Sequence, residues 1–217
     1  MNNQSLLKTA IKAALEAGNV ISEIYHDPAS DFEVEKKADN SPLTIADRKS
    51  NEVIINHLKQ TPYPIISEEC KNMDYAIRKE WKTVWVVDPL DGTKEFIKRN
   101  GEFTVNIALV YEGRPALGVI YIPEKRVLYY GTLQGGAYRM DNVDAKNGAD
   151  FAVIENRSIK LPLERKDGKY IVVASRSHMS AETESYINSL KEQHGEVSLT
   201  SIGSSIKICL VAEGSAD

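Results

Sequence analysis

The chain has 217 residues, of which 42% are hydrophobic, 27% charged and 7% aromatic, a composition typical of a globular protein and not of a disordered or fibrous one. Its formal net charge of -4 at pH 7 argues against a nucleic-acid coat protein or a polybasic membrane anchor, because both concentrate Lys and Arg. A small anionic ligand is compatible with this charge, since it needs only local positive charge or a metal ion.

Residues 5–25 predict an amphipathic first helix, because apolar residues recur at helical spacing with Lys and Glu on the opposite side. The N-terminus lacks the basic segment of a signal peptide, and no run approaches the ~20 apolar residues of a membrane span. Cys70 and Cys209 are far apart, which disfavours a zinc site and fits a reducing cytoplasm. We expect a soluble cytoplasmic protein without nucleic acid or an integral membrane segment, and leave open a peripheral contact with the inner membrane.

A second helix is predicted to begin near Thr44. Thr44 and Asp47 have the spacing of a capping box, and the residues that follow them continue the helix. Thr61-Pro-Tyr-Pro64 ends it. Ile65-Ile66 then predicts a short buried strand that runs into the acidic segment Ser67-Glu68-Glu69.

A largely antiparallel sheet is predicted from the middle of the chain. Residues 81–87 form an apolar run that Asp88-Pro89 is expected to stop, and residues 103–111 alternate between two faces, as a strand does. Further strands of a meander are expected at 116–121, 126–130 and 136–140.

The last third of the chain predicts alternating strands and helices, after a polar segment, 141–167, that resists assignment. The expected elements are a strand at 171–174, a helix at 181–193, a strand at 197–199 and a helix at 204–213. Helices, an antiparallel sheet and then alternating elements favour a layered mixed α/β (α+β) domain. One domain over residues 1–217 is the simpler prediction for this length.

The hexapeptide Asp88-Pro-Leu-Asp-Gly-Thr93 is the strongest functional signal. Pro and Gly force a turn in which Asp88 and Asp91 can point into one pocket. A hard divalent cation would find two carboxylates and the exposed Leu90 carbonyl there, and Glu68 ends the preceding strand. An isolated Pro-x-Asp-Gly would be a simple β-turn, but the whole hexapeptide with its apolar strand and upstream glutamate favours a metal site.

This hexapeptide and its upstream glutamate resemble the signature of the inositol-monophosphatase superfamily, and the resemblance covers essentially the whole chain. It implies the layered αβαβα sandwich of that family and Mg²⁺ as the cofactor. The metal ligands that it implies are Glu68, Asp88, the Leu90 carbonyl and Asp91. It also implies that Thr93, paired with Asp47, helps to activate the attacking water in a two-metal mechanism.

Lys94-Glu95-Phe96 resembles the bisphosphate nucleotidases of the CysQ type, whereas inositol monophosphatases usually continue their turn with Thr-Asn-Phe. The resemblance implies hydrolysis of the 3'-phosphate of adenosine 3',5'-bisphosphate, a small-molecule nucleotide, to AMP and phosphate. Two alternatives stay open. One is an inositol monophosphatase or other sugar phosphatase of the same fold, and the other is a noncatalytic metal- or nucleotide-binding protein. The sequence does not determine the oligomeric state.

Two later segments resemble the substrate contacts of these nucleotidases. Ser175-Arg-Ser-His178 is similar to their nucleotide-contacting loop, and Gly203-Ser-Ser-Ile-Lys207 is similar to the helix start that holds the second phosphate of the substrate. Without the resemblance, a loop His is usually solvated and a Lys in the first turn of a helix is usually surface charge. The implied substrate contacts are Glu68, Leu90, Asp91, Gly92, Thr93, Ser175, His178, Gly203 and Lys207.

Members of the resembled family continue beyond the segment that matches Ala212-Glu-Gly-Ser-Ala-Asp217. They carry a further strand and a tryptophan-aspartate motif, whose aspartate completes the metal site. Asp217 aligns before that motif and is not expected to be this ligand. We therefore expect the sequence to be part of a longer phosphatase domain that lacks its C-terminal portion.

Overall fold

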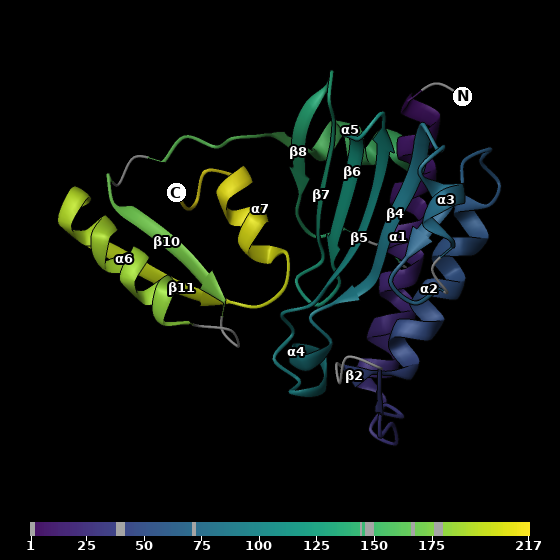
Figure 1. Cartoon of the computed structure of the whole chain (residues 1–217), viewed down its shortest axis with the longest axis horizontal. Helices are drawn as coiled ribbons and strands as arrows, with labels where there is room; N and C mark the ends of the chain where they lie inside the picture. Colours follow the sequence, from purple (N-terminus) through teal and green to yellow (C-terminus); the bar gives the residue numbers. More distant parts are fainter. Residues whose placement is uncertain are drawn as a thin grey trace.

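The helices and sheets of the protein lie in layers (Figure 1). A computed structural model describes residues 3–37, 42–70, 73–143, 145, 150–165, 168–175 and 180–217. Helices α1 (Asn3–His26) and α2 (Ile45–Leu58) cover one face of the larger sheet, and α7 (Ile206–Ala212) lies on its other face. A smaller sheet follows, and α6 (Ala181–His194) forms the outermost layer. The predicted αβαβα layering is confirmed.

The larger sheet contains seven strands among the described residues, in the order β3-β4-β5-β6-β7-β8-β9. β3 and β4 run parallel, and each later pair of neighbours runs antiparallel, so the predicted meander is confirmed. The strands are β3 (Ile65–Ser67), β4 (Thr83–Asp91), β5 (Thr104–Tyr111), β6 (Arg114–Ile122), β7 (Val127–Thr132), β8 (Gly136–Met140) and β9 (Ile159–Lys160).

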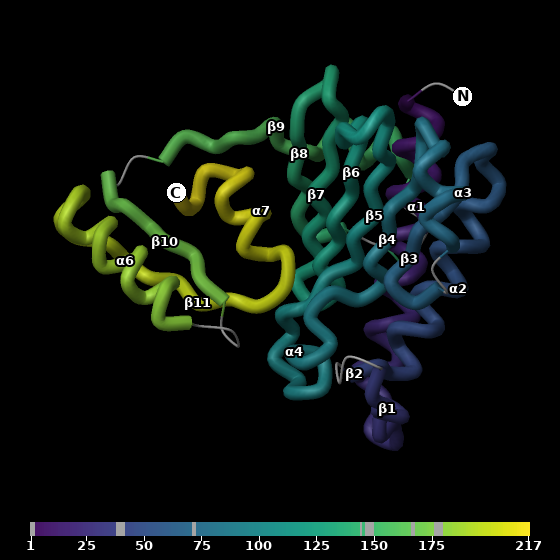
Figure 2. The backbone as a smooth tube through the Cα atoms, viewed as in Figure 1, coloured from purple at the N-terminus to yellow at the C-terminus, as the bar shows by residue number. Residues whose placement is uncertain are grey.

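The second sheet pairs β10 (Tyr170–Ser175) parallel to β11 (Val197–Ile202), and α6 provides the crossover that parallel strands require. Figure 2 shows the chain leaving the larger sheet after β9 to form this second sheet on the far side of α7. The remaining described elements are the antiparallel pair β1 (Glu35–Lys36) and β2 (Pro42–Leu43) and the helices α3 (Tyr75–Arg78), α4 (Thr93–Ile97) and α5 (Phe151–Arg157). None of the described helices is long and apolar enough to cross a bilayer.

Strand periodicity gives the larger sheet two apolar faces. On β6, Val119 and Tyr121 are buried in the main core with residues of α1 and α2, whereas Ile122 belongs to a second cluster with Ile206 of α7. Gly18 of α1 lies so close to the sheet that a Cβ atom there would approach Cε1 of Tyr121 to 2.4 Å. The sheet is therefore held between α1 and α7.

Several boundaries differ from the sequence-based predictions. β4 does not stop at Asp88 but continues to Asp91, and an irregularity in its pairing with β5 accommodates Pro89, which has no N–H to donate. α7 begins at Ile206 instead of Ser204. The unassigned segment 141–167 contains α5 and β9, which are too short to produce a clear periodic pattern.

Candidate active site

The parallel pairing of β3 and β4 brings acidic residues from two strands to the same edge of the sheet. Ser67 pairs with Val87, so that Glu68 and Asp88 both follow directly after the paired residues. The backbone N–H of Glu68 donates to the Val87 carbonyl at 3.1 Å, which continues the pairing by one more bond. This register explains why acidic residues separated by 20 positions in the sequence share one site.

The turn that follows Asp88 is held by one hydrogen bond inside the turn and by one from helix α2. The backbone N–H of Leu90 donates to Asp88 Oδ1 at 3.2 Å, and the buried Ser50 of α2 donates from its Oγ to the Pro89 carbonyl at 2.7 Å. Sequence reasoning missed Ser50, because a single serine in a helix carries no signal of its partner. These two bonds fix the conformation of the turn between Asp88 and Asp91.

The surroundings of Asp88 shift the pKa of its carboxyl group strongly. Burial, with the nearby charges of Asp91 and Glu68, raises the pKa of Asp88 to about 8. A divalent cation would relieve the same repulsion.

Asp47 lies on the first turn of α2, where it serves two contacts. Its Oδ2 accepts hydrogen bonds from the backbone N–H and the Oγ of Thr44, at 2.8 and 2.5 Å, so the predicted capping box is confirmed. Its Oδ1 accepts from the Thr93 hydroxyl at 3.1 Å, which brings together the two residues expected to activate water. Burial raises the pKa of Asp47, and these hydrogen bonds oppose the rise.

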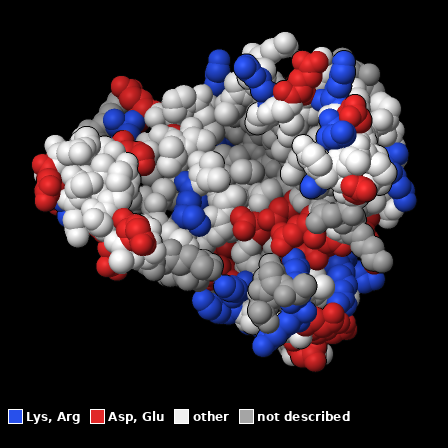
Figure 3. Space-filling view, viewed as in Figure 1, with Lys and Arg blue, Asp and Glu red and all other residues white. Residues whose placement is uncertain are grey.

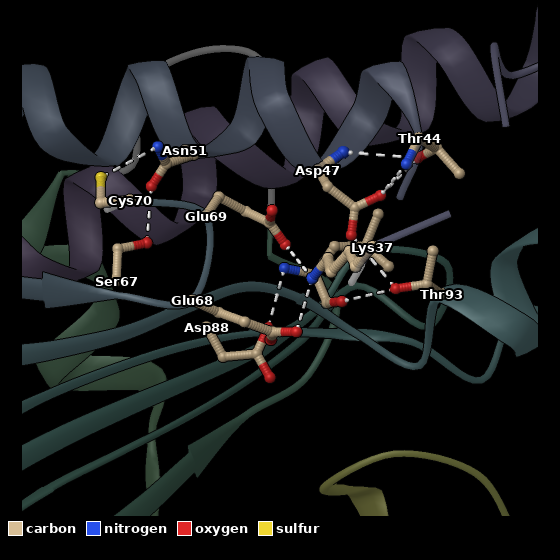
Figure 4. A network of polar contacts seen from close by, with 11 residues as sticks. Lys37, Thr44, Asp47, Asn51, Ser67, Glu68, Glu69, Cys70, Asp88 and Thr93 are labelled. Atoms are coloured by element: carbon tan, nitrogen blue, oxygen red, sulfur yellow. Dashed lines mark hydrogen bonds and ion pairs between the residues drawn. The ribbon is translucent and has the colours of Figure 1, made fainter. Parts of the chain in front are cut away.

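Lys37 is a cation that sequence reasoning did not assign to the site. Its Nζ donates to Glu68 Oε1 at 2.6 Å and to Glu69 Oε1 at 2.5 Å, and Figure 4 shows its ammonium group directed toward these two carboxylates. Burial disfavours its charge, but the hydrogen bonds to Glu68 and Glu69 outweigh burial and raise the pKa of Lys37. The residue lies in a polar stretch of the sequence without a periodic pattern, which is why it was missed.

The donor set suits Mg²⁺ in its chemistry. Glu68, Asp88, Asp91 and the Leu90 carbonyl offer the oxygen ligands that hard divalent cations prefer. Burial and the repulsion of Asp91 and Glu68 both raise the pKa of Asp88. In the present side-chain conformations, the described residues contain no group of three or more Asp, Glu, His or Cys side chains arranged to hold a metal ion. Oε1 of Glu68 is engaged by Lys37 and Oδ2 of Asp91 by the Ser205 N–H, so a metal ion at these carboxylates would compete with both partners or share the carboxylates with them.

A cavity of about 390 Å³ lies between the acidic turn and the start of α7. In Figure 3, acidic side chains form a continuous patch at the lower edge of the central hollow, with basic side chains around it. A larger groove of about 470 Å³ between β6–β8 and α7 has no charged residue in its lining, so it is unsuited to a phosphate. The residues that line the smaller cavity are Pro42, Glu68, Asp91, Gly92, Thr93, Lys94, Glu95, Ser175, Gly203, Ser204, Ser205, Lys207 and Ile208.

The turn before α7 differs in detail from the expected anion site. The backbone N–H of Gly203 donates to Glu102 Oε2 at 2.8 Å, and that of Ser205 donates to Asp91 Oδ2 at 2.5 Å, so these two amides are already engaged. Lys207 folds back, and its Nζ donates to the Ser204 carbonyl at 2.7 Å. Ser175, Gly203 and Lys207 do line the cavity, whereas His178 lies outside the described residues.

Comparisons with known proteins agree with one another over almost the whole chain. The sequence pattern of the inositol monophosphatase family matches residues 2–217. The 3'(2'),5'-bisphosphate nucleotidase CysQ of Escherichia coli O157:H7 is 45% identical over 213 residues, which cover 97% of this chain and 78% of that protein. The CysQ of Buchnera aphidicola is 37% identical over 98% of this chain and 74% of that protein.

A solved structure extends the similarity to the fold. The crystal structure of CysQ from Bacteroides thetaiotaomicron, described as a bacterial member of the inositol monophosphatase family, matches with a TM-score of 0.90 and 56% sequence identity. The match covers 99% of this chain and 79% of that one. A more distant structure, the extragenic suppressor protein suhB from Bartonella henselae, matches with a TM-score of 0.75 at 24% identity over 98% of this chain and 76% of that one, which supports the fold alone.

Proposed function

The chain belongs to the inositol monophosphatase family, and from this premise we propose that it is a 3'(2'),5'-bisphosphate nucleotidase. In this proposal it hydrolyses the 3'-phosphate of adenosine 3',5'-bisphosphate to give AMP and inorganic phosphate. The observation that carries the proposal is a cavity with carboxylates on one wall and Lys207 on the other. A bisphosphate can place its reacting phosphate at the first wall and its second phosphate at the other, and the 45% identity to a CysQ nucleotidase supports the same substrate.

Enzymes of this family are metal-dependent phosphatases, and Mg²⁺ is the metal that we propose for this chain. The residues proposed to hold it are Glu68, Asp88, Asp91 and, through its carbonyl oxygen, Leu90. The bound metal would supply charge neutralisation at the phosphate and a lower pKa for the attacking water. Burial, together with the charges of Asp91 and Glu68, raises the pKa of Asp88 to about 8. A metal ion would lower the energy of these neighbouring carboxylates, which supports this choice of ligands.

The protein's own part in the reaction is orientation and proton transfer. Thr93 lies on the cavity wall with its hydroxyl 3.1 Å from Asp47 Oδ1, so that it can accept a hydrogen bond from the water while it donates to Asp47. Asp47 is 1% exposed, and its two bonds from Thr44 fix the direction of the carboxylate. We assign Thr93 and Asp47 the role of positioning the water and receiving its proton.

The second phosphate and the nucleoside are assigned to the opposite wall. Without a ligand, Lys207 donates to the backbone carbonyls of Ile202 and Ser204. A phosphate dianion in the cavity would be a stronger acceptor for the same ammonium group. Ser175 and Gly203 line the same wall, and His178 is kept as a proposed contact on the basis of the sequence alone. Gly92 and Thr93 complete the proposed contacts to the reacting phosphate.

We further propose that residues 1–217 belong to one phosphatase domain that acts on small-molecule nucleotides in the cytoplasm. A contact with the inner membrane has no support among the described residues and is not part of the proposal.

The proposal is tested by the identity of the product. Purified protein is incubated with adenosine 3',5'-bisphosphate with and without Mg²⁺, and the nucleotide products are separated by chromatography. We expect 5'-AMP and one equivalent of phosphate, dependent on Mg²⁺. Formation of 3'-AMP, or release of phosphate at the same rate in the presence of EDTA, would overturn the proposed reaction.

A further inference from the structure

Lys37 lies immediately after β1, in the middle of the acidic site. Its side chain is 18% exposed, and its Nζ lies 2.6 Å from Glu68 Oε1 and 2.5 Å from Glu69 Oε1. Glu69 is 8% exposed at its side chain and has no role in the proposed reaction. Figure 4 shows that Glu68 and Asp88 lie close together on one side of Lys37, with Asp47 and Thr93 on another.

We infer that Lys37 is a built-in counter-ion that neutralises Glu68 in the metal-free protein and competes with the metal ion for that carboxylate. The inference rests on the proposed function, because it takes Glu68 as a metal ligand. It adds a residue that sets the metal affinity of the site without binding the metal.

Electrostatics gives the reason for such a device. Several carboxylates that face one another are destabilising unless a cation lies among them, and without the metal the ammonium group of Lys37 supplies that charge. Lys37 occupies Oε1 of Glu68, so a metal ion that binds this carboxylate must either displace the ammonium or share the carboxylate with it. Both outcomes weaken the Lys37–Glu68 ion pair and reduce the net free energy of metal binding. The positive charge of Lys37 also repels the metal at short range.

Glu69 makes the exchange feasible. When Glu68 turns to a metal ion, Lys37 keeps its 2.5 Å contact with Glu69, so the ammonium is not left buried without a partner. A buried charge without a partner would strongly destabilise the protein. With two acceptors, Lys37 can lose its hydrogen bond to Glu68 and still keep the one to Glu69.

The competing explanation is that Lys37 only orients Glu68 for the metal. The two explanations predict opposite signs. If Lys37 competes, its replacement by the uncharged Met strengthens metal binding and destabilises the metal-free protein. If Lys37 orients Glu68, the same replacement weakens metal binding.

The experiment measures Mg²⁺ binding by isothermal titration calorimetry without substrate, for the wild type, Lys37→Met and the control Lys36→Met. Lys36 is exposed on β1 and carries the same charge one position away. We expect about tenfold tighter Mg²⁺ binding in Lys37→Met and no change in Lys36→Met. The melting temperature of Lys37→Met should be lower than that of the wild type without metal and should rise more on addition of saturating Mg²⁺.

Unchanged or weaker Mg²⁺ binding in Lys37→Met would overturn the inference and leave the proposed function intact. If the wild type itself bound no Mg²⁺, the proposed metal site would fall, and this inference with it. Lys37→Gln, which keeps a polar side chain, replaces Lys37→Met if the latter does not fold, and the same signs are expected of it.

Discussion

The carboxylate of Asp91 accepts a hydrogen bond from the backbone N–H of Ser205, with 2.5 Å between Oδ2 and N. This bond joins the acidic turn at the end of β4 to the segment that begins α7, and Ser205 Oγ donates in turn to Asn106 Oδ1 on β5 at 2.9 Å. The two walls of the cavity are thus tied together by a proposed metal ligand. Metal binding by Asp91 is therefore expected to change the position of Ser205 on the opposite wall.

We predict that Asp91→Asn reduces the turnover of adenosine 3',5'-bisphosphate by more than about tenfold, while the melting temperature of the metal-free protein does not fall, because one of several neighbouring negative charges is removed. The amide oxygen of Asn can still accept the Ser205 N–H, so the change removes charge without removing the connection between the walls. Phosphate release at saturating Mg²⁺ and thermal unfolding measure the two effects. Retention of more than a tenth of the wild-type rate would exclude Asp91 as a ligand.

Lys207→Ala is predicted to lower kcat/KM for the bisphosphate by about tenfold and to leave kcat/KM for a simple monophosphate nearly unchanged. The reason is that Lys207 is assigned to the phosphate that does not react. Lys191→Ala is the matched control, because Lys191 is an exposed lysine on α6 that does not line the cavity. Equal losses on both substrates would assign Lys207 to the fold or to the reacting phosphate instead.

Thr93→Val should lower kcat by about a hundredfold with a smaller effect on KM. Valine has nearly the same shape as threonine but can neither donate to Asp47 nor accept from water. Thr93→Ser keeps the hydroxyl and should restore most of the rate. If the valine and serine variants had equal rates, the Thr93–Asp47 bond would have no part in catalysis.

Gly18→Ala is a prediction about stability alone. Alanine gains about 1 kcal/mol in helix propensity over glycine, but its Cβ would lie 2.4 Å from Tyr121 Cε1, and relieving such a clash in a packed core typically costs about 1–3 kcal/mol. We expect a net decrease in the free energy of unfolding, measured by urea denaturation. Gly118→Ala, where an added Cβ meets nothing within 4 Å, should not be destabilised. A stable Gly18→Ala variant would mean that α1 moves away from the sheet.

The parts of the fold that depend on local sequence were predictable. The capping pair Thr44 and Asp47 marked the start of α2, and alternation along β5 marked a strand with two faces. The hexapeptide from Asp88 to Thr93 was recognisable because, together with its apolar strand and the upstream Glu68, it resembles the signature of a known family. The boundary at Asp88 was wrong, because only the pairing with β5 decides that β4 continues to Asp91.

Contacts between distant segments could not be predicted. Lys37 with Glu69, Ser50 with the Pro89 carbonyl, and Glu102 with the Gly203 N–H each join common residue types far apart in the chain. The sequence around one partner gives no indication of which residue the other partner is. Each contact forms only when the layers of the fold pack together.

The most direct test of the central claim is a comparison of kcat/KM for three substrates at one Mg²⁺ concentration: adenosine 3',5'-bisphosphate, inositol 1-phosphate and fructose 1,6-bisphosphate. The account predicts that the adenosine bisphosphate is preferred by at least about tenfold over both others, because only it combines a nucleoside with two phosphates spaced for the two walls of the cavity. An equal or higher kcat/KM for inositol 1-phosphate or fructose 1,6-bisphosphate would contradict the account and assign the chain to the sugar-phosphate branch of its family.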